Sequence, residues 1–186
     1  MTGAPDPTPV DFRGLEDIAG ADWLVVPLPE EVRGKPKRWA NSTTSRLFPW
    51  YVRPFRTAEV ISTAASLEVL CRMSAPDLRF AVFRPQLTSI TNTTTVAVSA
   101  TDERLVGPGS APADGLRAGT GTRWEAGAET WPFLDAAGAV AARRWQFRSG
   151  SSTITVTGIG DHAAAFAGAE ASLEAFVRRI TTQGEC

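Results

Sequence analysis

The chain contains few of the residue types on which catalytic and metal sites most often depend. Its 186 residues include one histidine, His162, and two cysteines, Cys71 and Cys186. A zinc site needs three or four nitrogen or sulfur ligands at close spacing, so this inventory argues against a metal site. The two cysteines are also too few, and too far apart in the sequence, to form a disulfide framework.

Long apolar runs and nucleotide-binding motifs are missing as well. No run of about 18 apolar residues is present, so we expect no membrane-spanning helix. The glycine-rich segment 107–127 lacks the Gly-Lys-Ser/Thr ending of a phosphate-binding loop. No serine lies in a Gly-x-Ser-x-Gly motif, which argues against one common hydrolase nucleophile. These absences predict no cofactor.

The single histidine does not predict an active site. His162 follows Asp161, which fits the N-cap of a helix, so we interpret His162 as a first-turn residue rather than a general base. We therefore expect a protein that is not an enzyme. A pair of carboxylates that meets only in three dimensions stays open, because such pairs cannot be recognised in a sequence.

The overall composition is that of a folded domain. The chain is 43% hydrophobic and 21% charged, which is typical of globular proteins and unlike disordered chains. We expect one domain over residues 23–181, preceded by a flexible acidic arm rich in Pro and Gly over residues 1–22, with a short tail at 182–186. The first residues carry acids and prolines where a signal peptide has a basic start, so we expect a cytoplasmic protein.

The most distinctive segment is strongly basic and rich in aromatics. Residues 33–56 contain seven basic residues and no acid, whereas the whole chain has a net charge of −1. The segment therefore carries +7, and the rest of the chain sums to −8. Its five aromatic residues are Trp39, Phe48, Trp50, Tyr51 and Phe55. A charge asymmetry of this kind predicts that the segment either meets something negative or packs in a special way, and it does not specify which.

Hydrophobic alternation predicts strands in the first two thirds of the chain. Residues 23–26 fit a short edge strand that ends at a proline. Residues 57–66 fit a helix or a strand. From residue 67 the apolar period becomes two, so we predict that 67–73 and 78–84 form a β-hairpin around the turn 74–77. The runs 87–91 and 94–100 also fit strands, and 107–127 is predicted to be a mobile loop.

The last third predicts a β-hairpin followed by an amphipathic helix. Residues 139–148 and 151–158 fit two strands joined at Ser149-Gly150. From Asp161 onward, one apolar residue recurs at each helical turn, which predicts a helix packed on the sheet. The residues of this apolar face are Phe166, Ala169, Leu173, Phe176, Val177 and Ile180. The fold class we predict is α+β, with a mainly antiparallel sheet built from consecutive hairpins and a C-terminal helix on it.

Three interpretations of the basic–aromatic segment remain open at this level. It is a solvated loop, a protein-binding surface or a nucleic-acid or phosphate site. We favour a protein-binding or assembly component, with an acidic protein surface or a homo-oligomer neighbour as its partner and no membrane. The predicted contact residues are Arg38, Arg46, Trp50, Tyr51, Arg53 and Arg56. The alternative is a small-molecule-binding domain or enzyme with a cavity between the sheet and the terminal helix.

Overall fold

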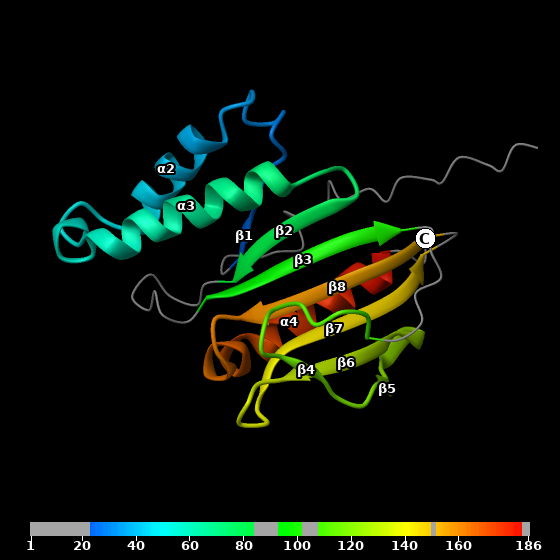
Figure 1. The fold of residues 1–186 in the computed structure, drawn as a ribbon. Helices are drawn as coiled ribbons and strands as arrows, with labels where there is room; N and C mark the ends of the chain where they lie inside the picture. Colours follow the sequence, from blue (N-terminus) through cyan, green and yellow to red (C-terminus); the bar gives the residue numbers. More distant parts are fainter. Residues whose placement is uncertain (1–22, 84–92, 102–107, 150–151, 184–186) are drawn as a thin grey trace, which may run out of the picture.

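The described part of the chain forms one antiparallel sheet with helices on both faces (Figure 1). The structure is a computed structural model that describes residues 23–83, 93–101, 108–149 and 152–183. The strands are β1 (Trp23–Val25), β2 (Leu78–Phe83), β3 (Thr94–Thr101), β4 (Arg117–Ala118), β5 (Thr122–Arg123), β6 (Glu129–Leu134), β7 (Val140–Ser149) and β8 (Ser152–Gly160). The helices are α2 (Pro36–Leu47), α3 (Thr57–Met73) and α4 (Ala163–Gln183), with the 3-10 turns η2 (Arg53–Phe55) and η3 (Glu125–Gly127).

The topology confirms the predicted fold class. The eight-stranded sheet has the order β1-β2-β3-β8-β7-β6-β4, and β5 also pairs with β6. Every pairing is antiparallel, and β2–β3, β6–β7 and β7–β8 join strands that follow one another in the chain. β3 and β4 do not pair with each other, and β8 lies beside β3 instead.

Successive side chains along the strands belong to two hydrophobic cores, one on each face of the sheet. Val96 and Val98 of β3 pack with α4, whereas Ala97 between them packs with the cluster that includes α2 and α3. Successive side chains of a strand point to opposite faces, so α4 covers one face and the α2–α3 pair covers the other. The cover by α2 and α3 is confined to β1, β2 and β3, where Phe80 and Val82 lie beneath it.

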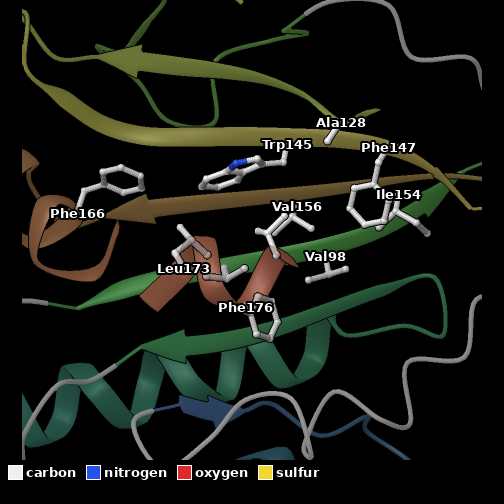
Figure 2. Packing of buried hydrophobic residues seen from close by; sticks show 11 residues of the cluster. Val98, Ala128, Trp145, Phe147, Ile154, Val156, Phe166, Leu173 and Phe176 are labelled. Atoms are coloured by element: carbon white, nitrogen blue, oxygen red, sulfur yellow. The ribbon is translucent and has the colours of Figure 1, made fainter. Parts of the chain in front are cut away.

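The face beneath α4 is closely packed (Figure 2). Trp145, Phe166 and Leu173 are fully buried there, together with Val156. A methyl group added at Gly158 would collide with the side chain of Leu173. At this point β8 and α4 leave no space between them, because protein interiors pack as densely as organic crystals.

Several predicted elements are confirmed. β1 is an edge strand, β2 and β3 fall within or close to the predicted runs 78–84 and 94–100, and β7 and β8 form the predicted C-terminal β-hairpin. In α4 the predicted apolar face is buried from Phe166 to Val177, and Ile180 packs against the same cluster. On the polar side of α4, Glu174 and Arg178 pair at 3.8 Å with the i,i+4 spacing that stabilises helices.

The prediction of a strand over 67–73 is wrong, because this segment is the second half of α3. The alternating residues divide between two sides of the helix. Leu67 and Cys71 are buried, whereas Val69 and Met73 are each 53% exposed. Residues four apart share a helix face, so a period-two pattern of four apolar residues also fits a helix with two apolar sides. The turn at 74–77 therefore joins α3 to β2 rather than two strands.

The helix cap also differs from the prediction. α4 begins at Ala163, and the Nδ1 atom of His162 accepts a hydrogen bond from the backbone N–H of Ala165 at 3.1 Å. His162 thus takes the capping role that the sequence predicts for Asp161. Its ring nitrogen satisfies one of the N–H groups that the first helical turn leaves without a partner.

The remaining predictions concern segments that are only partly described. The run 107–127 contains β4, β5 and η3, so short regular elements occupy what we predicted as a loop. The arm 1–22, the run 87–91 and the tail residues 184–186 lie outside the described residues, as does Gly150 of the predicted turn. β7 and β8 nevertheless pair up to Ser149 and Ser152, in the register of a short hairpin.

Candidate functional site

The basic–aromatic segment forms most of a helical hairpin, which we define as α2, its connection 48–56 and α3. Arg33 and Gly34 have φ angles of 54° and 66°, in the left-handed region, and they reverse the chain ahead of α2. Pro36 then starts α2, since proline has no N–H to leave unpaired and its fixed φ suits the first helical position. α2 and α3 lie side by side in Figure 1.

We define the hairpin tip as residues 49–56, at the end where α2 turns into α3. Trp50 is 79% exposed and Phe55 is 88% exposed, and Tyr51 between them is 60% exposed. The rings of Trp50 and Tyr51 contact each other edge to face, with centroids 6.0 Å apart. Three large aromatic side chains therefore face solvent within six residues of sequence.

Arg53 holds the tip against the end of α2. Its guanidinium donates hydrogen bonds to the backbone carbonyls of Ser45 at 2.6 Å and Phe48 at 2.8 Å. Carbonyls in the last turn of a helix have no partner within it, so an arginine there satisfies them and favours the negative end of the helix dipole. The next basic residue, Arg56, pairs with Glu59 at 3.5 Å. The tip is therefore built on specific contacts.

The opposite end of the helical hairpin carries the other cations. A hollow of about 460 Å³ lies between the start of α2 and the end of α3, and it is lined by Gly34, Lys35, Pro36, Lys37, Arg38, Asn41 and Arg72. We call it the cationic hollow. Arg72 pairs with Glu68 at 2.7 Å, but within the described residues no carboxylate pairs with Lys35, Lys37 or Arg38.

A second hollow borders the first. It measures about 400 Å³, and Lys35 and Arg38 line both hollows. Glu31 lies on the wall of this second hollow, and its carboxylate contacts Arg79 at 3.6 Å. The cationic hollow is therefore the more uniformly positive of the two, because no acid lines it.

The structure brings together four of the six predicted contact residues. Trp50, Tyr51, Arg53 and Arg56 lie at the tip. Arg46 lies in the last turn of α2, close to the tip in sequence, whereas Arg38 lies near the start of α2 in the wall of both hollows. Eight residues of α-helix separate Arg38 from Arg46, which is about 12 Å along the helix axis.

Sequence reasoning missed the outer face of α3, which we define by Ala58, Ile61, Ala65, Val69 and Met73. All five residues are exposed. Nine residues of α3 are exposed in total, and Arg72 is the only charged one among them. A helix side that faces water normally carries many charged residues, so this composition is unusual. The spacing of three or four residues from Ala58 to Met73 is the signal that would have revealed the face.

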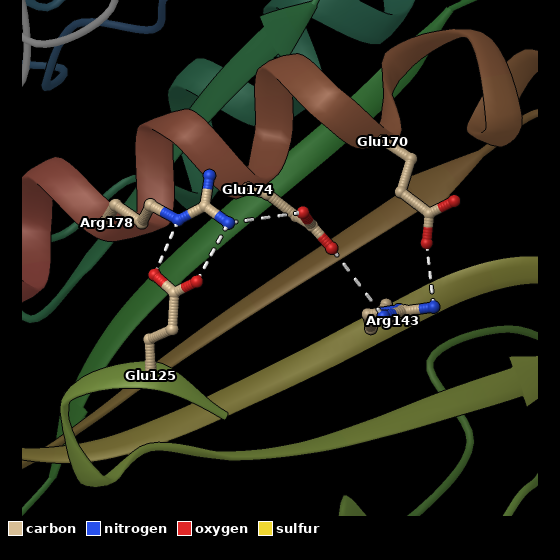
Figure 3. A network of polar contacts seen from close by, with 5 residues as sticks. All are labelled: Glu125, Arg143, Glu170, Glu174 and Arg178. Atoms are coloured by element: carbon tan, nitrogen blue, oxygen red, sulfur yellow. Dashed lines mark hydrogen bonds and ion pairs between the residues drawn. The ribbon is translucent and has the colours of Figure 1, made fainter. Parts of the chain in front are cut away.

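The clearest cluster of charges elsewhere joins η3 to α4 (Figure 3). Arg178 donates two hydrogen bonds to Glu125, at 2.8 and 3.2 Å, and this interaction raises the pKa of the Arg178 guanidinium. On the sheet, Arg143 contacts Glu170 at 2.7 Å and Glu174 at 3.8 Å. Each of these charged side chains contacts one of opposite charge. The network is therefore best explained as a set of ion pairs that connects α4 to β7 and η3 and stabilises the fold.

Within the described residues, no group of three or more histidine, cysteine, aspartate or glutamate side chains is arranged to hold a metal ion. The helices of that same part of the chain include none long and apolar enough to cross a membrane. Comparison with protein-family models, curated proteins and solved structures finds no match to this chain.

Proposed function

We propose that this protein is a non-catalytic assembly component that binds a protein partner through the tip of its helical hairpin. One observation carries this proposal. Among the described residues, the exposed large hydrophobic side chains all belong to the tip or to α3. They are Trp50, Tyr51, Phe55, Ile61, Val69 and Met73. Exposed apolar side chains that gather in one part of a molecule, here the tip and α3, mark interaction surfaces, whereas scattered ones need no explanation.

The chemistry of the tip supports a protein partner. Tryptophan, tyrosine and arginine are enriched among the residues that dominate binding energy at protein interfaces. At the tip Trp50 and Tyr51 are next to each other, and the ordered Arg53 follows within two positions. The cations on the rest of the helical hairpin favour a partner with an acidic surface, because complementary charge speeds association and selects between partners.

The packing beneath α4 provides no comparable support for the alternative of a ligand cavity between the sheet and the terminal helix. Phe166 and Leu173 fill the space at Gly158. A ligand site needs a concave space with a few polar groups directed into it. The aromatic tip is thus the better-supported binding surface.

The proposal is tested by comparing partner recovery with wild type and with Trp50→Ala in a pull-down from native host lysate. Because Trp50 is 79% exposed, its removal should change the free energy of unfolding by less than about 0.5 kcal/mol. Binding should weaken about tenfold or more, as expected for a central aromatic contact. The lysate is treated with nuclease first, so that a nucleic-acid bridge is not mistaken for a protein contact.

Two further variants make the result interpretable. Arg123→Ala removes an exposed cation on β5, far from the helical hairpin in the sheet order, and it should leave recovery unchanged. A variant with Arg38, Arg46, Arg53 and Arg56 all changed to alanine should lose the partner. If wild type, Trp50→Ala and this charge-neutralised variant recover the same proteins, the proposal is wrong. If proteins are recovered only when the nuclease treatment is omitted, the nucleic-acid interpretation replaces the proposal.

A further inference from the structure

The tip alone is too small for a standard protein interface. At roughly 200 Å² for a whole aromatic side chain, the exposed parts of Trp50, Tyr51 and Phe55 offer about 450 Å² together. A stable interface of standard size covers about 800 Å² on each partner. A partner that binds the tip therefore needs adjoining surface.

The outer face of α3 supplies that surface. It begins at Ala58, one turn after Phe55, and continues to Met73 at the end of the helix. Ile61 is 63% exposed and Val69 is 53% exposed, with the small residue Ala65 between them. Small side chains at the centre of such a face allow another backbone to approach closely. The 17 residues of α3 extend over about 25 Å.

Cations border this apolar face at both ends. Arg53 and Arg56 lie at the tip end, and the cationic hollow lies at the other end, where Arg72 of α3 meets Lys37 and Arg38 of α2. An apolar face bordered by cations is complementary to an apolar face bordered by carboxylates. A second copy of the helical hairpin does not meet this requirement, because residues 36–73 contain six basic residues and two acids.

We propose that the partner segment is an amphipathic helix of about five turns that lies along the outer face of α3. Its apolar side chains, spaced three or four residues apart, pack on Ile61, Ala65 and Val69 and reach the aromatic tip. Acidic side chains along its edge enter the cationic hollow and meet Lys37 and Arg38 there. This inference rests on the proposed function, and it specifies the partner of the same surface.

The test uses synthetic peptides as probes. One 18-residue peptide has leucines at helical spacing and glutamates along one edge, and a matched peptide has lysines in place of those glutamates. Each carries a fluorescent label, and binding to the full chain is followed by fluorescence anisotropy at physiological ionic strength. The glutamate peptide should bind saturably, and the lysine peptide should bind at least tenfold more weakly. Absence of saturable binding, or equal binding of both peptides, overturns the inference.

Two double variants test the two halves of the surface separately. Ile61→Ser with Val69→Ser removes the apolar contact, and Arg38→Ala with Arg72→Ala removes cations from the hollow. Each should lower the affinity for the glutamate peptide about tenfold, while Arg123→Ala leaves it unchanged. Thermal unfolding of each variant confirms that the fold is retained, which is expected because all four positions are exposed. Affinity unaffected by the Ile61 and Val69 changes overturns the inference.

Two outcomes separate this inference from the proposed function. If the lysate partner is lost in Trp50→Ala but retained in the Ile61 and Val69 variant, the tip binds a protein and the helix inference is wrong. If neither variant changes recovery, both proposals fail.

A final experiment measures binding to anionic vesicles of phosphatidylserine and phosphatidylcholine. Binding to these vesicles without binding to the glutamate peptide would replace the helix with a lipid surface.

Discussion

The contact between β8 and α4 at Gly158 allows a quantitative test of the packing. A β-carbon added at this glycine would collide with Cδ2 of Leu173, and it would approach Cε2 of Phe166 to 3.5 Å. Leu173 and Phe166 are both fully buried, so neither side chain can move into solvent. Gly158→Ala should therefore lower the free energy of unfolding by about 1–3 kcal/mol, the usual cost of overpacking a core.

A change at Leu173 should relieve the collision that an alanine at residue 158 would cause. Leu173→Ala removes three buried carbon atoms and leaves a cavity, which should cost about 2–5 kcal/mol. In the double variant, the methyl group at residue 158 enters the space that Leu173 had filled. The two costs should then fail to add, with the double variant more stable than their sum by at least about 1 kcal/mol.

Urea unfolding followed by far-UV circular dichroism measures all four members of this cycle. The dependence of the free energy on urea must be the same for each variant, so that only stability is compared. Strictly additive costs, or a neutral Gly158→Ala, would refute the packing at this contact. Such a result would also reopen the alternative of a ligand cavity beneath α4.

Four other predictions concern stability and the buried thiol. Gly160→Ala should be more costly than Gly158→Ala, because the new methyl would lie 2.6 Å from the backbone nitrogen of Phe166, which cannot rotate away. Gly168→Ala, where nothing lies within 4 Å, should instead raise the free energy of unfolding by about 0.5–1 kcal/mol in the same urea assay. Burial, followed by the charge of Glu31, raises the pKa of Cys71. In a Cys186→Ser background, a thiol reagent should thus modify Cys71 only as fast as the protein opens, and fast labelling of the native protein would contradict its burial. The folded state keeps that proton while the unfolded thiol loses it, so this group should lower stability as the pH rises above about 8.5.

In the helical hairpin, the sequence predicted the residues of the tip but not the contacts that position them. The basic–aromatic segment was evident from composition, and the tip that it forms contains Trp50, Tyr51, Arg53 and Arg56 as one group. The exact role of Arg53 was not evident, because its hydrogen bonds to the carbonyls at the end of α2 depend on the backbone of the connection. Spacing along a chain does not specify which carbonyl a guanidinium will reach.

The error at α3 has a related cause. The apolar period of two predicted a strand that carries Leu67, Val69, Cys71 and Met73 on one face. Val69 and Met73 are exposed, so the apolar period of two reflects one buried side and one outward side of a helix. Sequence reasoning often fails where residues serve binding rather than folding. The failure at α3 thus points to the same surface that we propose for a partner helix.

Local sequence patterns were enough to predict the α+β class, most strands that the structure describes and the apolar face of α4. These features follow from local periodicity, because a period of two or of 3.6 residues specifies which side chains can share a buried face. The cationic hollow and the outward side of α3 depend instead on how the helices pack in three dimensions. Arg72 lies more than 30 positions after Arg38, and the packing of α3 against α2 alone brings them together. Contacts between residues so distant in sequence depend on how whole elements pack, and no local pattern records that arrangement.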